Sequence, residues 1–171
     1  MFCSAMDIDA SSAFAHNLPI RKDLEKMDSK EKIHVLFVCT HNSARSQMAE
    51  TFLNAIGGGR FEAESAGLEP QKIHPLVVKV MKEIGFDLSN KKPNNVLEFF
   101  KQGRLYHRVI FVCDKSTEEQ CPIFPGLGKR HSWPFPDPSR VEGTREEKLA
   151  QIRNIRDDIK SRIERWIRET Q

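Results

Sequence analysis

The sequence predicts one α/β domain built on a mostly parallel sheet, and three observations lead to this fold class. Apolar runs of β-forming residues, such as Ile33–Val38 and Val109–Val112, alternate with amphipathic helical patterns, as they do in βαβ units. The first run leads into a helical pattern over Ser46–Ile56. The chain has 171 residues, of which 39% are hydrophobic and 30% charged, and this suits a single domain with a sizeable core.

The first helix and the second strand follow from local patterns. The glycines Gly57-Gly58-Gly59 end the helix, and Phe61–Ala66 reads as the strand after it. The apolar side of the helix is formed by Met48, Ala49, Phe52, Leu53 and Ile56.

Two more helices are predicted before the third strand. One opens at Pro75, in the favoured first position of a helix, and ends at Gly85. The other opens at Pro93 and closes near Gly103. The first helix is expected to turn Val77, Val80, Met81 and Ile84 inward, and the second carries the apolar residues Val96, Leu97, Phe99 and Phe100.

The last third of the chain contains a short strand and a long helix. The polar stretch 114–120 is either a short helix or a mobile loop, and a fourth strand is expected at His131–Trp133. A helix follows over Thr144–Glu169, and Thr144 and Glu147 form a capping box at its start. Its apolar residues recur at spacings of three and four, at Leu149, Ile152, Ile155, Ile159, Ile163 and Trp166.

The amino-terminal segment differs in composition from the rest. Residues 1–32 read as a flexible extension, and residues 33–171 as the folded domain. Asp7 and Asp9 stand where an export signal carries positive charge, and no continuous apolar core follows them. Cys3 lies in this extension, where we expect a thiol without a function.

Charge and cysteine usage narrow the classes of function. The net charge of +3 is too small to indicate a nucleic acid or an anionic membrane as partner. No apolar run approaches the roughly 20 residues of a membrane-spanning helix. The four cysteines match no close metal-binding spacing, and a chain of this size needs no disulfide staples. We therefore expect catalytic or redox-active thiols in a reducing cytoplasm.

The loop between Cys39 and Arg45 is the most informative feature. A strand pattern ends at Cys39, and a helix begins directly after Arg45. Such a loop can turn its backbone N–H groups toward one centre, where the positive end of the helix dipole favours a negative sulfur and a tetrahedral anion. The planar guanidinium of Arg45 can hold two oxygens of that anion.

A second apolar strand pattern also ends in a cysteine, Cys113. If the two strands are neighbours in a parallel sheet, their ends lie about 5 Å apart, and Cys39 and Cys113 share one edge. Cys121 follows eight residues later, beyond the polar stretch. Three thiols at one edge could act as a relay, in which one attacks a substrate, one resolves the adduct and one carries the oxidised state to the surface.

Asp137 lies in the proline-rich segment Trp133–Pro138. Prolines on both sides stiffen the loop. A carboxylic acid held there over an oxyanion site can give a proton to a leaving oxygen. The alternative is an aspartate that only forms a turn.

Together these motifs resemble the low-molecular-weight tyrosine phosphatase superfamily, and within it the thioredoxin-coupled arsenate reductases. The resemblance extends from about Ile33 to Ile167. It is carried by Val38-Cys39-Thr40-His41-Asn42-Ser43-Ala44-Arg45-Ser46-Gln47-Met48-Ala49-Glu50, Ser65-Ala66-Gly67, Cys113 with Cys121-Pro122, and Trp133-Pro134-Phe135-Pro136-Asp137-Pro138.

The resemblance implies a four-stranded, mostly parallel sheet with helices on both faces. It implies Cys39 as nucleophile, Arg45 as oxyanion clamp and Asp137 as general acid, with Cys113 and Cys121 as the resolving pair. The remaining oxyanion-binding residues would be Thr40, His41, Asn42, Ser43, Ala44 and Ser46. Ala44 stands where many relatives carry a second loop cysteine, and Cys113 and Cys121 are one residue further apart than in typical members.

The resemblance implies an enzyme that requires no cofactor, although some members of the family bind potassium beside the loop. Asn42, Glu50 and Ser65 match three of the potassium ligands, whereas Asn94 falls where the described site has a carboxylate.

The implied activity is reduction of arsenate to arsenite, as in arsenical resistance, with phosphate and sulfate as competing anions. Cys113 would attack the Cys39 adduct, and Cys121 would then take over the disulfide, which thioredoxin would reduce.

Two other functions remain open from the sequence. A phosphotyrosine phosphatase would use a Cys39 phosphoenzyme, but phosphatases of this superfamily tend to carry tyrosines after the Asp-Pro. Here Ser139-Arg140 follows, and Tyr106 is the one tyrosine of the chain. A sensor of oxyanions or of redox state would bind or oxidise without turnover.

Overall fold

The computed structural model describes residues 32–113, 115–124 and 128–170. The predicted extension, with Cys3, lies outside the described residues except for Lys32. The domain that starts at residue 33 is therefore described apart from two short gaps and its last residue.

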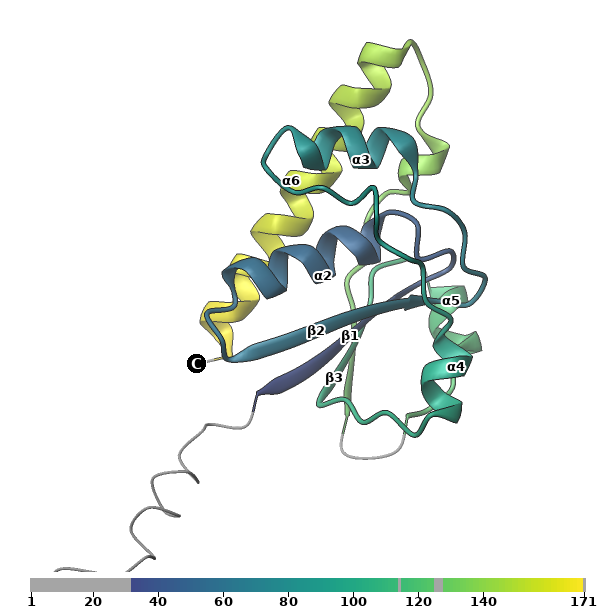
Figure 1. The fold of residues 1–171 in the computed structure, drawn as a ribbon, viewed down its shortest axis with the longest axis vertical. Helices are drawn as coiled ribbons and strands as arrows, with labels where there is room; N and C mark the ends of the chain where they lie inside the picture. The colour runs from purple at the N-terminus through teal and green to yellow at the C-terminus, as the bar shows by residue number, and fades with distance from the viewer. Residues whose placement is uncertain (1–31, 114, 125–127, 171) are drawn as a thin grey trace, which may run out of the picture. The chain divides into compact units, whose positions relative to one another are not determined.

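A four-stranded parallel sheet forms the centre of the domain (Figure 1). Its strands, in the spatial order β2-β1-β3-β4, are β2 (Phe61–Gly67), β1 (Ile33–Cys39), β3 (Arg108–Phe111) and β4 (Lys129–Ser132). The α/β class and the parallel sheet are confirmed. The fourth strand starts two residues before the predicted position, because its pairing with β3 begins at Lys129.

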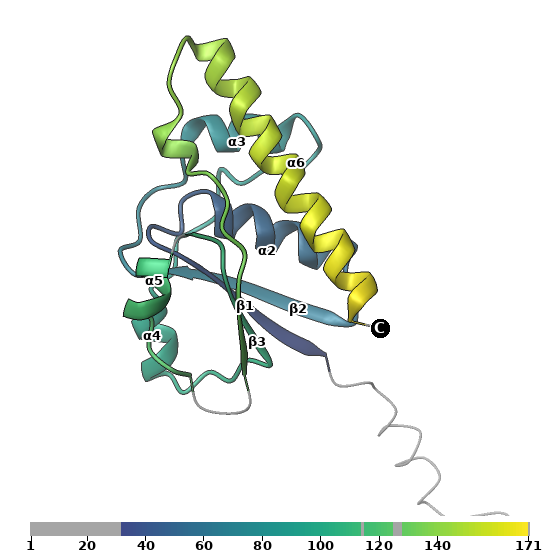
Figure 2. The ribbon, with the colours of Figure 1, turned by 180° about the vertical axis from the view of Figure 1, so that it is seen from behind.

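Helices cover both faces of the sheet, as Figures 1 and 2 show from opposite sides. One face carries α2 (Arg45–Ile56), α3 (Pro75–Lys82) and α6 (Arg145–Glu169), and the other carries α4 (Val96–Lys101) and α5 (Lys115–Gln120). A short 3-10 turn, η1 (Pro138–Arg140), precedes α6. The polar stretch before Cys121, for which the sequence left a short helix or a mobile loop open, therefore forms a helix, α5.

Strand β1 is buried on both faces, which explains its uninterrupted apolar sequence. Successive side chains point to opposite faces of a strand. Phe37 and Cys39 accordingly belong to the core under α2, α3 and α6, whereas Leu36 and Val38 belong to the core on the α4 side.

Two helix predictions were wrong in detail. Helix α4 begins at Val96 and not at Pro93, because the Asn95 side chain accepts hydrogen bonds from the N–H groups of Leu97 and Glu98 and so caps the helix there. Ile84 is exposed, since α3 ends at Lys82 before its pattern is complete.

The long helix α6 starts as predicted. The Thr144 hydroxyl accepts from the Glu147 N–H, and the Glu147 carboxylate accepts from the Thr144 N–H, which completes the capping box. Among the described residues, no helix is long and apolar enough to cross a membrane.

The strand order reverses at β1, and this locates the site. The chain runs from β1 to β2 on one side and later returns to β3 on the other side of β1. The carboxyl ends of β1 and β3 therefore meet at the switch point, which is where open α/β sheets bind their ligands. Cys39 is the last residue of β1.

Candidate active site

The Cys39 sulfur is buried and takes part in two hydrogen bonds. The Asn42 N–H donates to Sγ over 3.0 Å, and the Ser46 hydroxyl lies 2.9 Å from it. The Ser46 oxygen also accepts a hydrogen bond from Asn42 Nδ2, which holds it beside the sulfur. Both contacts fix the position of the sulfur at the mouth of the loop. Ser46, which was predicted to bind the oxyanion, thus contacts Cys39, the predicted nucleophile.

The backbone of the loop is held from outside by the segment after β2. Three loop carbonyls accept N–H groups of this segment: Thr40 from Glu69 at 2.8 Å, His41 from Gln71 at 2.9 Å and Ser43 from His74 at 2.9 Å. In a trans peptide the N–H points away from the C=O. The N–H groups that follow these carbonyls are therefore turned toward the inside of the loop, as an oxyanion cradle requires.

Asn42 is the structural centre of the loop. It is fully buried and has a left-handed φ of 50°, which is costly for a residue other than glycine. Its side chain offsets this cost by accepting from Gln47 Nε2 (2.9 Å) and the Asn94 N–H (2.8 Å) and by donating to Ser46 and Ser65 (2.9 Å each). The four hydrogen bonds hold the loop in one conformation.

Arg45 and Asp137 lie side by side although 92 residues separate them. Arg45 opens α2, and its guanidinium donates to Asp137 Oδ2 over 2.8 Å and to the Phe135 carbonyl over 3.0 Å. The predicted clamp and the predicted acid therefore share one site. In this state the arginine is engaged by the carboxylate.

The Asp137 carboxyl is ionised in this state. Burial alone would raise its pKa, but the N–H and hydroxyl of Ser139 and the charges of Arg45 and Arg140 outweigh burial and lower the pKa below its usual value. A general acid needs the opposite shift. An oxyanion in the loop would supply it, because it adds negative charge and draws Arg45 away from the carboxylate.

The predicted pairing of the two cysteine-ended strands is confirmed. In the parallel register Val38 is opposite Phe111, and the Val112 N–H donates to the Val38 carbonyl over 3.0 Å. Cys113 follows at once and is buried in the same core cluster as Cys39, with its Sγ 3.9 Å from the Val38 carbonyl oxygen. Two thiols therefore lie at adjacent strand ends.

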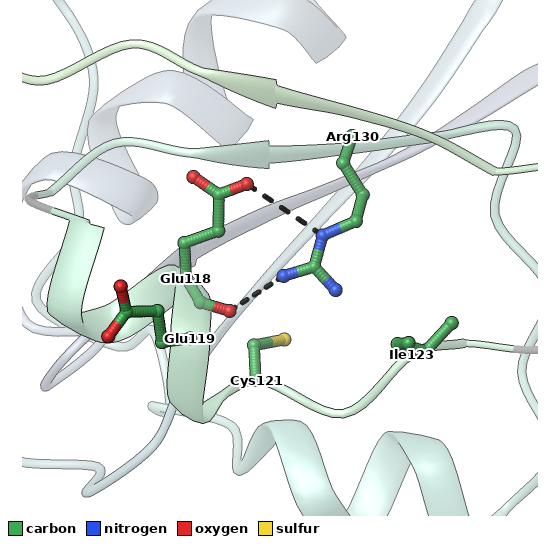
Figure 3. A pocket seen from close by; sticks show the side chains of 5 residues that line it. All are labelled: Glu118, Glu119, Cys121, Ile123 and Arg130. Carbon is green, nitrogen blue, oxygen red and sulfur yellow. Dashed lines mark hydrogen bonds and ion pairs between the residues drawn. The ribbon is translucent and has the colours of Figure 1, made fainter.

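Cys121 lies beyond α5, in the core on the other face of the sheet. Its thiol faces a pocket lined by Glu118, Glu119, Ile123 and Arg130 (Figure 3). Arg130 donates to the Glu118 carbonyl over 2.6 Å and so ties the last turn of α5 to β4. No disulfide links the described cysteines Cys39, Cys113 and Cys121.

A family model, that of the low molecular weight phosphotyrosine protein phosphatases, matches residues 34–171. The chain belongs to this family. It is also similar to the arsenate reductase of Bacillus subtilis, with 37% identity over 133 residues, which are 77% of this chain and 93% of that protein.

Solved structures of both enzyme types resemble the fold. The thioredoxin-dependent arsenate reductase of Corynebacterium glutamicum matches with a TM-score of 0.62 and 29% identity, over 86% of this chain and 67% of that one. The low molecular weight protein tyrosine phosphatase from T. tengcongensis matches with a TM-score of 0.64 and 25% identity, over 81% and 99%.

Three residues of this phosphatase-family site escaped the sequence analysis. Ser139 fixes Asp137 and could have been found, since a serine two residues after an aspartate is a common turn signal. Gln47 donates to Asn42 within the same loop and helix start, and Lys91 pairs with Glu50 across the fold; the sequence pattern indicated neither contact.

Gly67 limits what the loop can tolerate. A Cβ at this position would lie 2.7 Å from the Asn42 nitrogen and 2.9 Å from the Thr40 oxygen. We expect Gly67→Ala to push the loop outward, to weaken sulfate binding about tenfold and to lower the free energy of unfolding by about 1–3 kcal/mol. Calorimetric titration with sulfate and urea unfolding would measure both. Gly58→Ala offers a control for an added methyl group, because nothing lies within 4 Å of a Cβ there, although its positive φ carries a strain of its own. Unchanged sulfate affinity in Gly67→Ala would contradict this account of the loop.

The Cys121 thiol should react slowly at neutral pH. Burial raises its pKa to about 11, helped by Cys113 and Glu118 and opposed by Arg130. Only the thiolate attacks disulfides and alkylating agents. In a Cys39→Ser, Cys113→Ser variant, the alkylation rate at Cys121 should therefore rise about tenfold per pH unit between pH 7 and 10. Mass spectrometry of the Cys121 peptide measures this rate, and a plateau below pH 9 would contradict the burial effect.

Proposed function

We propose that this protein reduces arsenate to arsenite through a relay of Cys39, Cys113 and Cys121. The similarity to curated arsenate reductases over nearly their full length supports this substrate. Arsenate would bind in the Cys39–Arg45 loop as a tetrahedral oxyanion, and phosphate and sulfate would compete for the same N–H groups.

The observation that carries the proposal is the second buried thiol at the neighbouring strand end. Hydrolysis of a phosphate ester needs one nucleophile, an arginine and an acid, all of which Cys39, Arg45 and Asp137 provide. Ester hydrolysis leaves Cys113 without a chemical role. Reduction of arsenic(V) to arsenic(III) takes two electrons, and two thiols that join as a disulfide supply them.

In the first step the Cys39 thiolate attacks arsenic. A sulfur–arsenic bond forms and an arsenic–oxygen bond breaks, and Asp137 gives its proton to the departing oxygen, which leaves as water. Arg45 turns from Asp137 to the remaining oxygens and holds them with its two-pronged guanidinium.

In the second step Cys113, as a thiolate, attacks the sulfur of Cys39. The new sulfur–sulfur bond displaces the arsenic, which keeps the electron pair of the sulfur–arsenic bond and leaves as arsenite. The products are arsenic(III) and a Cys39–Cys113 disulfide, so that the two electrons are accounted for.

In the third step Cys121 attacks Cys113 and releases the Cys39 thiolate. We propose that thioredoxin then reduces the Cys113–Cys121 disulfide. Ile123, with 80% of its surface exposed, lies beside Cys121 and offers an apolar contact for that partner. Because this exchange needs a reducing compartment, we assign the reaction to the cytoplasm.

The test is a coupled assay with thioredoxin, thioredoxin reductase and NADPH. Arsenate should cause NADPH oxidation, and both sulfate and phosphate should inhibit it competitively. Omission of thioredoxin should stop turnover; continued turnover with glutathione would assign a different electron donor.

Hydrolysis of phosphotyrosine is the second candidate function. The similarity to the T. tengcongensis phosphatase and the Cys39, Arg45 and Asp137 arrangement favour it. Efficient phosphotyrosine hydrolysis without arsenate-dependent NADPH oxidation would establish this function instead.

A further inference from the structure

Beside the oxyanion loop, a lysine pairs with a carboxylate that the family resemblance implies as a potassium ligand. Lys91 forms an ion pair with Glu50, and the side chains keep only 30% and 16% of their surface exposed. The other oxygen of the Glu50 carboxylate accepts the Ser65 hydroxyl. Glu50 and Ser65 are two of the three residues that match potassium ligands of the family.

The four candidate ligands, Asn42, Glu50, Ser65 and Asn94, do not fit a resident potassium ion. Asn42 Oδ1 already accepts two hydrogen bonds, from Gln47 and Asn94. Both Glu50 oxygens are engaged, and the Asn94 side chain donates to the Ser65 carbonyl over 3.0 Å. Glu50, the one carboxylate among these candidate ligands, is neutralised by the ammonium group of Lys91.

A continuous chain of contacts connects Lys91 to the nucleophile. It runs from Lys91 to Glu50, from Glu50 to Ser65, and from Ser65 to the Asn42 amide, 2.9 Å away. Asn42 in turn contacts the Cys39 sulfur through its own N–H and through Ser46. The Asn42 amide that holds the strained φ is thus oriented by a pair that lies outside the loop.

We propose that Lys91 is a built-in replacement for a monovalent cation, which holds Glu50, Ser65 and Asn42 in place and makes the oxyanion loop independent of potassium. An unneutralised Glu50 would repel both the thiolate and an incoming oxyanion. A dissolved ion neutralises it only in proportion to its concentration. A tethered ammonium is present at every salt composition.

Replacement of Lys91 should create a dependence on potassium that the natural protein lacks. In the natural protein, sulfate affinity and arsenate kcat/KM should change by less than about twofold when choline replaces potassium at constant ionic strength. In Lys91→Gln both should fall about tenfold in choline, because Glu50 is left without its partner. Potassium should restore much of this loss, and lithium should not.

Two further variants complete the experiment. Lys92→Gln removes the neighbouring exposed lysine and the same formal charge, and it should behave like the natural protein in both salts. Lys91→Arg keeps the charge and should stay insensitive to potassium, which a general loss of stability would not explain.

Sulfate titration needs no turnover, so this test remains valid whether the protein proves to be a reductase or a phosphatase. The proposal is overturned if the natural protein gains affinity or activity from potassium. It is equally overturned if Lys91→Gln binds sulfate normally in choline. Should Lys91→Gln fail to fold, a potassium-dependent Lys91→Arg protein would also refute it.

Discussion

Cys39→Ser should abolish arsenate reduction, with kcat/KM lower by about 10⁴-fold or more. A serine hydroxyl is a much weaker nucleophile than a cysteine thiol at neutral pH, so the contacts with Asn42 and Ser46 would no longer position an effective nucleophile. Any hydrolysis of phosphate esters should disappear together with reduction, because one sulfur starts both reactions.

The coupled assay and a phosphate-ester assay on the same preparation measure both losses. Sulfate should still bind to Cys39→Ser, since the loop carbonyls remain tied to the segment 69–74. Retained reduction in this variant would remove Cys39 from the role of nucleophile.

Cys113→Ser should stop turnover with thioredoxin while leaving phosphate-ester hydrolysis intact. Cys39 can still attack arsenate, but no second thiol lies at the adjacent strand end to release it. Cys121→Ser should behave differently: it should complete one turnover and then retain a Cys39–Cys113 disulfide.

Peptide mass spectrometry after one equivalent of arsenate distinguishes the two variants. The disulfide-linked peptides should appear in Cys121→Ser and be absent from Cys113→Ser, with the natural protein treated in parallel as control. Multiple turnovers in both variants would falsify the three-thiol relay.

The local parts of the site could be predicted from the sequence, because local patterns determine them. A strand that ends at Cys39 and a helix that begins at Arg45 depend on residues a few positions apart, and the structure has both. The capping box of α6 is equally local. The start of α4 was missed because the Asn95 side chain, rather than the Pro93 ring, decides where that helix begins.

Contacts between segments that are distant in the sequence were harder to predict. Cys39 and Cys113 are close because β1 and β3 are neighbours in the sheet. The sequence does not determine the order of the strands, so this proximity could be predicted only for the case that the two strands pair. The pair of Lys91 with Glu50 depends on how the chain between α3 and α4 lies against α2, and nothing in the neighbouring residues predicts this.

The ion pair between Arg45 and Asp137 also bears on the direction of the reaction. Every incoming oxyanion must compete with a carboxylate of the protein for the same guanidinium. Arsenate carries the charge needed to win this competition, whereas arsenous acid, the reduced product, is uncharged at neutral pH. Once the arsenic is reduced, we expect the arginine to return to Asp137, so that the uncharged product keeps no ion pair with it. We therefore expect the Asp137 carboxylate to compete with every ligand for Arg45, to be displaced by the charged substrate and to favour release of the uncharged product.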